Sequence, residues 1–113
     1  MSAGSLNITV EQGSTFQYPV QIMEADGVTP VDLTGYTFGG MIRLNYNDAT
    51  PLATFTINET DLVNGSFAFE LTSATTTALS FKRAMYDIEI TSPTSVTSRV
   101  LEGFVRLSKE VTK

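Results

Sequence analysis

The segment from Ala84 to Leu107 constrains the fold of this chain more than any other stretch. Apolar residues at positions 86, 88 and 90 alternate with polar residues at 87, 89 and 91, which is the period of a strand with one buried face. Residues 92–95 (SPTS) break the pattern with turn chemistry. A second strand then returns through Leu101, Val105 and Leu107. The segment therefore predicts a long β-hairpin.

The sequence leaves the register of this hairpin open. One register pairs Ile88 with Val100, and another pairs Tyr86 with Leu101. The dipeptide at 102–103, in the middle of the second strand, is a candidate β-bulge that would decide between the two. Tyr86 stands near the start of its strand, where it is either an ordinary core aromatic residue or a tyrosine corner.

The remaining chain repeats the same alternation in short segments separated by turn residues. Strands are predicted at residues 6–10, 16–23, 36–44, 53–57 and 67–71, which with the hairpin makes about seven. Between them, residues 73–80 predict one helical turn capped by Ser73. Many short strands with almost no helix favour an all-β fold, an immunoglobulin-like antiparallel β-sandwich of about seven strands.

Three local signals refine this prediction. Pro19 cannot donate a hydrogen bond to a neighbouring strand, so its strand is expected to have a free edge. The pair at 39–40 (GG) indicates a bulge or a close approach of two backbones. Asn64-Gly65 predicts a tight type I′ turn with positive φ at both residues.

A chain of 113 residues is expected to fold as one domain. Residues 1–5 are small and polar and predict a flexible N-terminal arm, so the sandwich domain is assigned to residues 6–113. The alternating positions also give a predicted core, which consists of Phe16, Tyr18, Val20, Phe38, Ile42, Phe55, Phe67, Phe69, Tyr86, Ile88 and Leu101.

The composition argues against site chemistry. The chain has no cysteine and no histidine, which removes thiolate metal ligands and the usual acid–base group at neutral pH. Asp87 and Glu89 share one strand face and are interpreted as solvated carboxylates paired with Arg99 across the hairpin. We therefore predict no catalytic residues, no cofactor and no metal site, and no enzymatic activity.

Charge and hydropathy restrict the partners in the same way. Seven Lys and Arg against twelve Asp and Glu leave a net charge of −5, which disfavours binding to nucleic acid. No apolar segment approaches the ~20 residues of a membrane span, and the N-terminus lacks the pattern of a signal peptide. We expect a protein made in a cytoplasm that contacts neither nucleic acid nor membrane.

Five short phrases, taken in order, resemble a small β-sandwich module of tailed bacteriophages. They are residues 10–16 (VEQGSTF), 31–36 (VDLTGY), 71–79 (Leu71-Thr72 with Thr77 and Leu79), 85–90 (MYDIEI) and 100–105 (VLEGFV), and the chain closes on 110–112 (EVT). This set is similar to the N-terminal domain of phage baseplate upper proteins, which are receptor-binding adaptors, and covers nearly the whole chain. The family often has glycine before the Tyr-Asp phrase, where this chain has residues 82–84 (KRA).

The resemblance implies a virion structural protein that docks onto other virion proteins and self-associates in symmetric copies. A tail or baseplate location is expected, and the alternative is a capsid decoration protein on the head. A carbohydrate-binding module is the alternative of another class, but most of the eleven aromatic residues fall in the inward phase of a strand. Residues 1–5 together with a sheet edge are the expected attachment surface.

Overall fold

The computed structural model describes residues 4–45, 48 and 50–109. Strands take up 54% of these described residues and helices 8%, so the described chain is mostly β, as predicted. The elements in chain order are β1 (Gly4–Ser5), β2 (Ile8–Glu11), β3 (Phe16–Gln21), β4 (Thr37–Arg43), β5 (Ala53–Thr54), β6 (Thr56–Asp61), the 3-10 helix η1 (Leu62–Asn64), β7 (Ser66–Leu71), α1 (Ser73–Thr77), β8 (Arg83–Thr91) and β9 (Thr97–Ser108).

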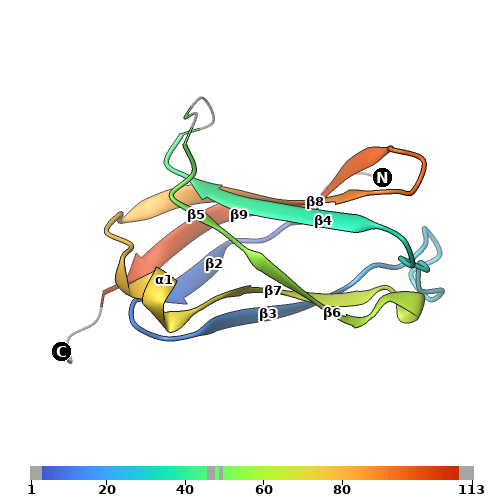
Figure 1. Ribbon diagram of the computed structural model, residues 1–113, viewed down its shortest axis with the longest axis horizontal. Helices are drawn as coiled ribbons and strands as arrows, with labels where there is room; N and C mark the ends of the chain where they lie inside the picture. Colours follow the sequence, from blue (N-terminus) through green and yellow to red (C-terminus); the bar gives the residue numbers. More distant parts are fainter. Residues whose placement is uncertain (1–3, 46–47, 49, 110–113) are drawn as a thin grey trace.

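The strands form two sheets that lie one above the other (Figure 1). The larger sheet has the order β1-β9-β8-β4-β5, with β2 also paired to β9, and the smaller sheet has the order β3-β7-β6. Both β1 and β2 run parallel to β9, so the prediction of purely antiparallel sheets is wrong for the larger one. The period of two is the same in parallel and antiparallel strands, so the alternation could not distinguish them.

Two of the predicted segments differ in the structure. The segment 53–57 becomes β5 in the larger sheet and β6 in the smaller one, and the chain crosses between the layers at Phe55. Phe55 itself is buried between the layers. At the N-terminus, Gly4 pairs with Leu101 and Ser5 with Glu102, so these two residues form a strand instead of the predicted flexible arm. Residues 1–3 of that arm lie outside the described residues.

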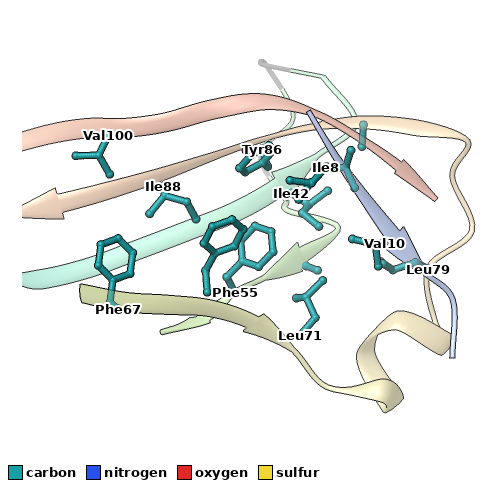
Figure 2. Close-up of a cluster of buried hydrophobic side chains, with 14 of the residues drawn as sticks. Ile8, Val10, Ile42, Phe55, Phe67, Leu71, Leu79, Tyr86, Ile88 and Val100 are labelled. Carbon is teal, nitrogen blue, oxygen red and sulfur yellow. The ribbon is translucent and has the colours of Figure 1, made fainter. Parts of the chain in front are cut away.

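The space between the sheets is filled by side chains from both (Figure 2). Six predicted core residues are buried, namely Ile42, Phe55, Phe67, Phe69, Tyr86 and Ile88. Phe16, Val20, Phe38 and Leu101 are partly buried against this cluster. Tyr18 is 37% exposed, so its place in the predicted core is wrong. It lies on β3, which has only β7 beside it, and its outer side is therefore left uncovered.

Phe69 is the centre of an aromatic cluster that joins the two layers. Its ring lies 5.0 Å from that of Phe55 and 5.8 Å from that of Phe16, measured between centroids. Tyr86 from the opposite sheet stacks on it at 6.0 Å. Such aromatic pairs contribute ~0.5–1.5 kcal/mol each beyond the burial of their surface. The cluster therefore fixes how the sheets are placed on each other.

The hairpin of β8 and β9 forms, but with neither of the two predicted registers. Ile88 pairs with Leu101 and Tyr86 with Gly103. The register shifts after Ile88, because Glu89 pairs with Arg99 and Val100 is the extra residue. The bulge is therefore at Val100 and not at residues 102–103. Val100 is buried, so the extra residue adds its side chain to the core.

The connections agree with part of the predicted turn chemistry. Gly65 has φ of +73° and ends η1, but Asn64 belongs to that helix and is not a positive-φ residue. The connection is therefore not a type I′ turn. Helix α1 is capped by Thr72, whose hydroxyl accepts a hydrogen bond from the Thr75 amide. The predicted cap at Ser73 is wrong by one residue.

The glycine pair at 39–40 shows a close approach and no bulge. The pairing of β4 with β8 is continuous from Thr37 to Arg43. A Cβ atom on Gly40 would lie 2.5 Å from Cδ1 of Ile88 and 3.2 Å from Cδ2 of Phe55. Gly40 therefore leaves the room into which these two core side chains pack. Gly39 faces open space, because a Cβ atom added there would meet nothing within 4 Å.

Candidate functional site

The outer face of the larger sheet carries the candidate site. In β8 the even-numbered residues from Ala84 to Ile90 are buried, so residues 83, 85, 87, 89 and 91 point outward. The pairing places Met85 beside Arg43 on one side and Phe104 on the other. In the next row Asp87 lies between Met41 and Glu102. We call these six residues the outer-face cluster: Met41, Arg43, Met85, Asp87, Glu102 and Phe104.

This cluster surrounds a hollow of about 300 Å³. Met41 and Phe104 are each 37% exposed, so the hollow has apolar walls as well as charged ones. Ser5 and Asn7 from the N-terminal segment also line it. The N-terminal segment and the outer face of the sheet thus share one surface, whereas the sequence analysis combined residues 1–5 with a sheet edge.

Charges within the cluster are arranged around Arg99. Asp87 and Glu102 are directly opposite each other on neighbouring strands, an arrangement of like charges that is destabilising by itself. Nε of Arg99 lies 3.4 Å from Oδ2 of Asp87, and Nη1 lies 3.0 Å from Oε1 of Glu102. The hydrogen bond to Glu102 and then the charge of Asp87 raise the pKa of Arg99. The predicted pairing of Asp87 with Arg99 is confirmed.

Two further arginines, Arg83 and Arg43, contact the apolar side chains of the outer-face cluster. The guanidinium carbon of Arg83 lies 3.8 Å from the centre of the Phe104 ring, which is a cation–π contact. Arg43 donates from Nη2 to the sulfur of Met41 at 3.2 Å and from Nη1 to the carbonyl oxygen of Asp48. Each of these two exposed apolar side chains, Met41 and Phe104, therefore contacts an arginine.

The N-terminal segment is fixed to the sheet through Gly103. The hydroxyl of Tyr86 donates to the carbonyl oxygen of Leu6 at 2.7 Å, and Gly103 lies opposite Tyr86 in the pairing. A Cβ atom on Gly103 would be 2.0 Å from that same oxygen. Since Leu6 lies 80 residues before Tyr86, this bond is not a tyrosine corner, which bonds a few residues upstream. Burial raises the pKa of Tyr86.

The loop carboxylates of Asp26 and Asp32 accept hydrogen bonds within their own turns. Asp26 accepts hydrogen bonds from the amides of Val28 and Thr29 and from the Thr29 hydroxyl. These bonds lower its pKa, with the Thr29 amide as the largest cause. Hydrogen bonds from the hydroxyl and the amide of Thr34 lower the pKa of Asp32 in the same way. In the described part of the chain, no group of three or more acidic side chains is placed to hold a metal ion.

The free edge predicted from Pro19 is confirmed, because β3 pairs only with β7 and ends the smaller sheet. The amide of Ile22 points toward β7, where it donates to Gly65. Residues 17, 19 and 21 alternate with it and present their backbone groups to the open side. Pro19 has no amide hydrogen, so a strand added here would lose a hydrogen bond at its middle. This edge is poorly suited to strand addition.

The sequence phrases that carry the phage resemblance form turns, a buried core position and paired strands of the fold. The turn at residues 12–14 contacts the helix α1 region, because Thr76 donates to the Ser14 carbonyl oxygen and accepts from the Gly13 amide. Gln12 donates to the carbonyl oxygen of Leu79 at 2.8 Å. Leu33 is fully buried, and its amide donates to Leu62. The phrases at residues 85–90 and 100–105 form the paired strands next to the outer-face cluster.

Sequence reasoning missed the outer-face cluster, although it left a signal. Met85 and Phe104 are apolar residues in the outward phase of their strands, where solvated residues are expected.

In the described residues, no helix has both the length and the apolar character that a membrane crossing requires. No protein-family model matches the chain, and no curated protein matches it.

Proposed function

We propose that this chain is a non-enzymatic structural protein of a tailed-bacteriophage virion, an adaptor that docks onto other virion proteins. Its place is the tail or baseplate, in repeated copies. The resemblance set out above supplies the class of particle. The outer-face cluster supplies the attachment surface and is the single observation that carries the docking role.

The strand order supports the immunoglobulin-like form of this adaptor. The order β4-β8-β9 corresponds to strands C-F-G of an immunoglobulin sandwich, and β3-β7-β6 corresponds to B-E-D. Short β5 beside β4 takes the place of C′, one of the two extra strands in variable-type domains. The first strand departs from the constant-type order, because β1 and β2 join β9 instead of β3.

The residue types of the outer-face cluster support docking. Methionine, arginine and aromatic residues are enriched at the centre of protein interfaces relative to the rest of the surface. Here Met41, Met85, Arg43 and Phe104 gather around one hollow. Arg99 and its two ion-pair partners, Asp87 and Glu102, form a charged rim on one side of this hollow. A partner that fills the hollow would bury the apolar centre and leave the rim in water.

Purified particles test the location. Gel analysis of separated heads and tails should show this protein with the tails, and a band found only with heads would establish the decoration role instead. Binding of the isolated protein to a glycan array would support the carbohydrate-binding alternative and contradict the proposal.

Substitutions on the outer face test the surface. Met41→Ser combined with Phe104→Ser should leave the fold intact and reduce incorporation into particles. Leu52→Ser is the matched control, because Leu52 is an exposed apolar residue outside the hollow. Equal incorporation of the double variant and the control would show that the outer-face cluster is not the attachment surface.

A further inference from the structure

Three loops at one end of the molecule expose valine side chains. Val28 is 77% exposed in the connection from β3 to β4, Val63 is 63% exposed in η1, and Val96 is 60% exposed in the β8–β9 loop. Figure 1 shows these three segments at the same end of the sandwich, on the right. Two of these segments are joined at their bases, because the Leu33 amide donates to the Leu62 carbonyl oxygen at 2.8 Å. We call this the loop end.

The loop end is also acidic. Glu24, Asp26, Asp32 and Asp61 lie in or next to these loops, and the sequence has no lysine or arginine before Arg43 or between residues 44 and 81. Arg99, the nearest cation along the hairpin, is already paired with Asp87 and Glu102. None of these four carboxylates has a cation partner among the described residues, because both ion pairs there involve Arg99.

The opposite end carries the excess of cations. There β4 ends, β8 begins and β9 ends (Figure 1), which brings together Arg43, Lys82, Arg83, Arg106 and Lys109. Arg83 and Arg106 are directly opposite each other in the pairing. Neither belongs to an ion pair, since both ion pairs of the described residues involve Arg99. Phe104 adds an exposed apolar ring beside them. We call this the basic end.

We propose that a second copy of this chain docks its basic end onto the loop end, so that copies associate head to tail. The inference names one partner for the docking module and in that respect rests on the proposed function. Opposite charges at the two ends select this orientation, and like charges disfavour loop end against loop end. Such a contact is heterologous and leaves both outer ends open, so it extends into chains or closes into rings.

The size of the contact sets its strength. The molecule measures 44 × 29 × 22 Å, so the two shorter dimensions, 29 and 22 Å, set the cross-section of each end. The area of that cross-section is below the ~800 Å² that each partner contributes to a standard stable interface. The association of isolated copies is therefore weak and becomes effective where other contacts hold the copies in an array.

Sedimentation velocity of the full chain tests the association. The weight-average sedimentation coefficient should rise with protein concentration at low salt and return to the monomer value in ~1 M NaCl, where the Debye length is ~3 Å. A sedimentation coefficient that stays at the monomer value at every concentration in low salt would overturn self-association. Docking onto other virion proteins is measured separately, by incorporation into particles, and would be untouched by that result.

Paired variants test the orientation. Glu24→Lys with Val28→Lys alters the loop end, and Arg106→Glu with Lys109→Glu alters the basic end; all four side chains are exposed. Each variant alone should stay monomeric, and a mixture should form one-to-one dimers, because each variant keeps one intact end. Thr56→Lys and Asn58→Lys on β6, combined with Gln17→Lys across β7, form the β6 control. These three exposed residues lie away from the loops of the loop end, and together they give the same charge change as the loop-end variant. This control should associate like the wild type.

The outcomes separate the alternatives. Dimers formed by one end variant alone would indicate a symmetric contact and overturn the head-to-tail arrangement. Loss of association in the β6 control would show that net charge alone is responsible, which also overturns it. Circular dichroism melting of each variant verifies folding, and the salt dependence of the wild-type chain provides a test that needs no substitution.

Discussion

Replacing Gly103 with alanine should release the N-terminal segment from the larger sheet. The new Cβ would lie 2.0 Å from the carbonyl oxygen of Leu6 and 2.7 Å from its carbonyl carbon. Both are backbone atoms, so no side-chain rotation relieves the contact. The segment has to move by about 1.4 Å, the difference between 2.0 Å and the 3.4 Å at which ordinary contacts begin.

The cost follows from the hydrogen bonds that this movement breaks. Tyr86 is buried, and its hydroxyl would lose the Leu6 carbonyl, 2.7 Å away. A buried group left without a partner costs ~1–3 kcal/mol. The Leu6 amide also donates to Glu102, and Asn7 accepts from the Phe104 amide, at ~0.5–1.5 kcal/mol each. The expected loss is ~2–6 kcal/mol, a large part of the ~5–15 kcal/mol typical of a domain.

Urea denaturation measures this loss, with Gly39→Ala as the matched control. Gly39 is also a strand glycine of the same sheet, but a Cβ atom there meets nothing within 4 Å. The control should be neutral or stabilised by up to ~1 kcal/mol, because alanine reduces the entropy of the unfolded chain. In a Tyr86→Phe background, Gly103→Ala should cost less, since the hydrogen bond is already gone. Equal stability of the Gly103→Ala and Gly39→Ala variants would refute the reasoning.

Three further predictions concern the core, a turn and the pH dependence. Phe69→Ala should lower the free energy of unfolding by ~3–5 kcal/mol, because Phe69 is fully buried at the centre of the aromatic cluster; an unchanged denaturation midpoint would contradict this. Gly65→Val should destabilise through its φ of +73° and a Cβ contact of 2.6 Å with the Ile22 carbonyl oxygen, and a wild-type melting temperature would disprove it. Hydrogen bonds from Val28 and Thr29 lower the pKa of Asp26 in the folded protein. The ionised Asp26 carboxylate therefore stabilises the fold fully above the unfolded pKa of ~3.9. This stabilisation is lost as the pH falls through the lower pKa of the folded protein. The melting temperature of Asp26→Ala should therefore differ most from wild type near neutral pH and converge with it in strong acid, and a difference that stays constant with pH would argue against this role.

The sequence by itself determined where the strands are and which side of most of them is buried. Alternation is a local property, because successive side chains of a strand point to opposite faces. It therefore predicted the hairpin of β8 and β9 and the burial of Phe67, Phe69 and Ile88. Pro19 marked an edge strand for an equally local reason, the missing amide hydrogen. The absence of histidine and cysteine restricts the available chemistry through composition alone.

Only the tertiary structure decided which strands are neighbours. A period of two does not identify a partner or its direction, so the parallel pairing of β1 and β2 with β9 could not be read from the sequence. The bulge at Val100 depends on the fit of two strands. Tyr18 has the pattern of a core residue, but no strand covers the open side of β3.

The candidate site is also a feature that only the tertiary structure decided. Met41, Met85 and Phe104 are far apart in the chain and meet only because β4, β8 and β9 lie side by side. The same holds for the basic end, since Arg43 ends β4 and Arg106 is near the end of β9, and the directions of these strands place both at one end of the molecule (Figure 1). Residue types and spacing are local, but a surface is formed by the order and register of strands, which are set by packing across the whole core.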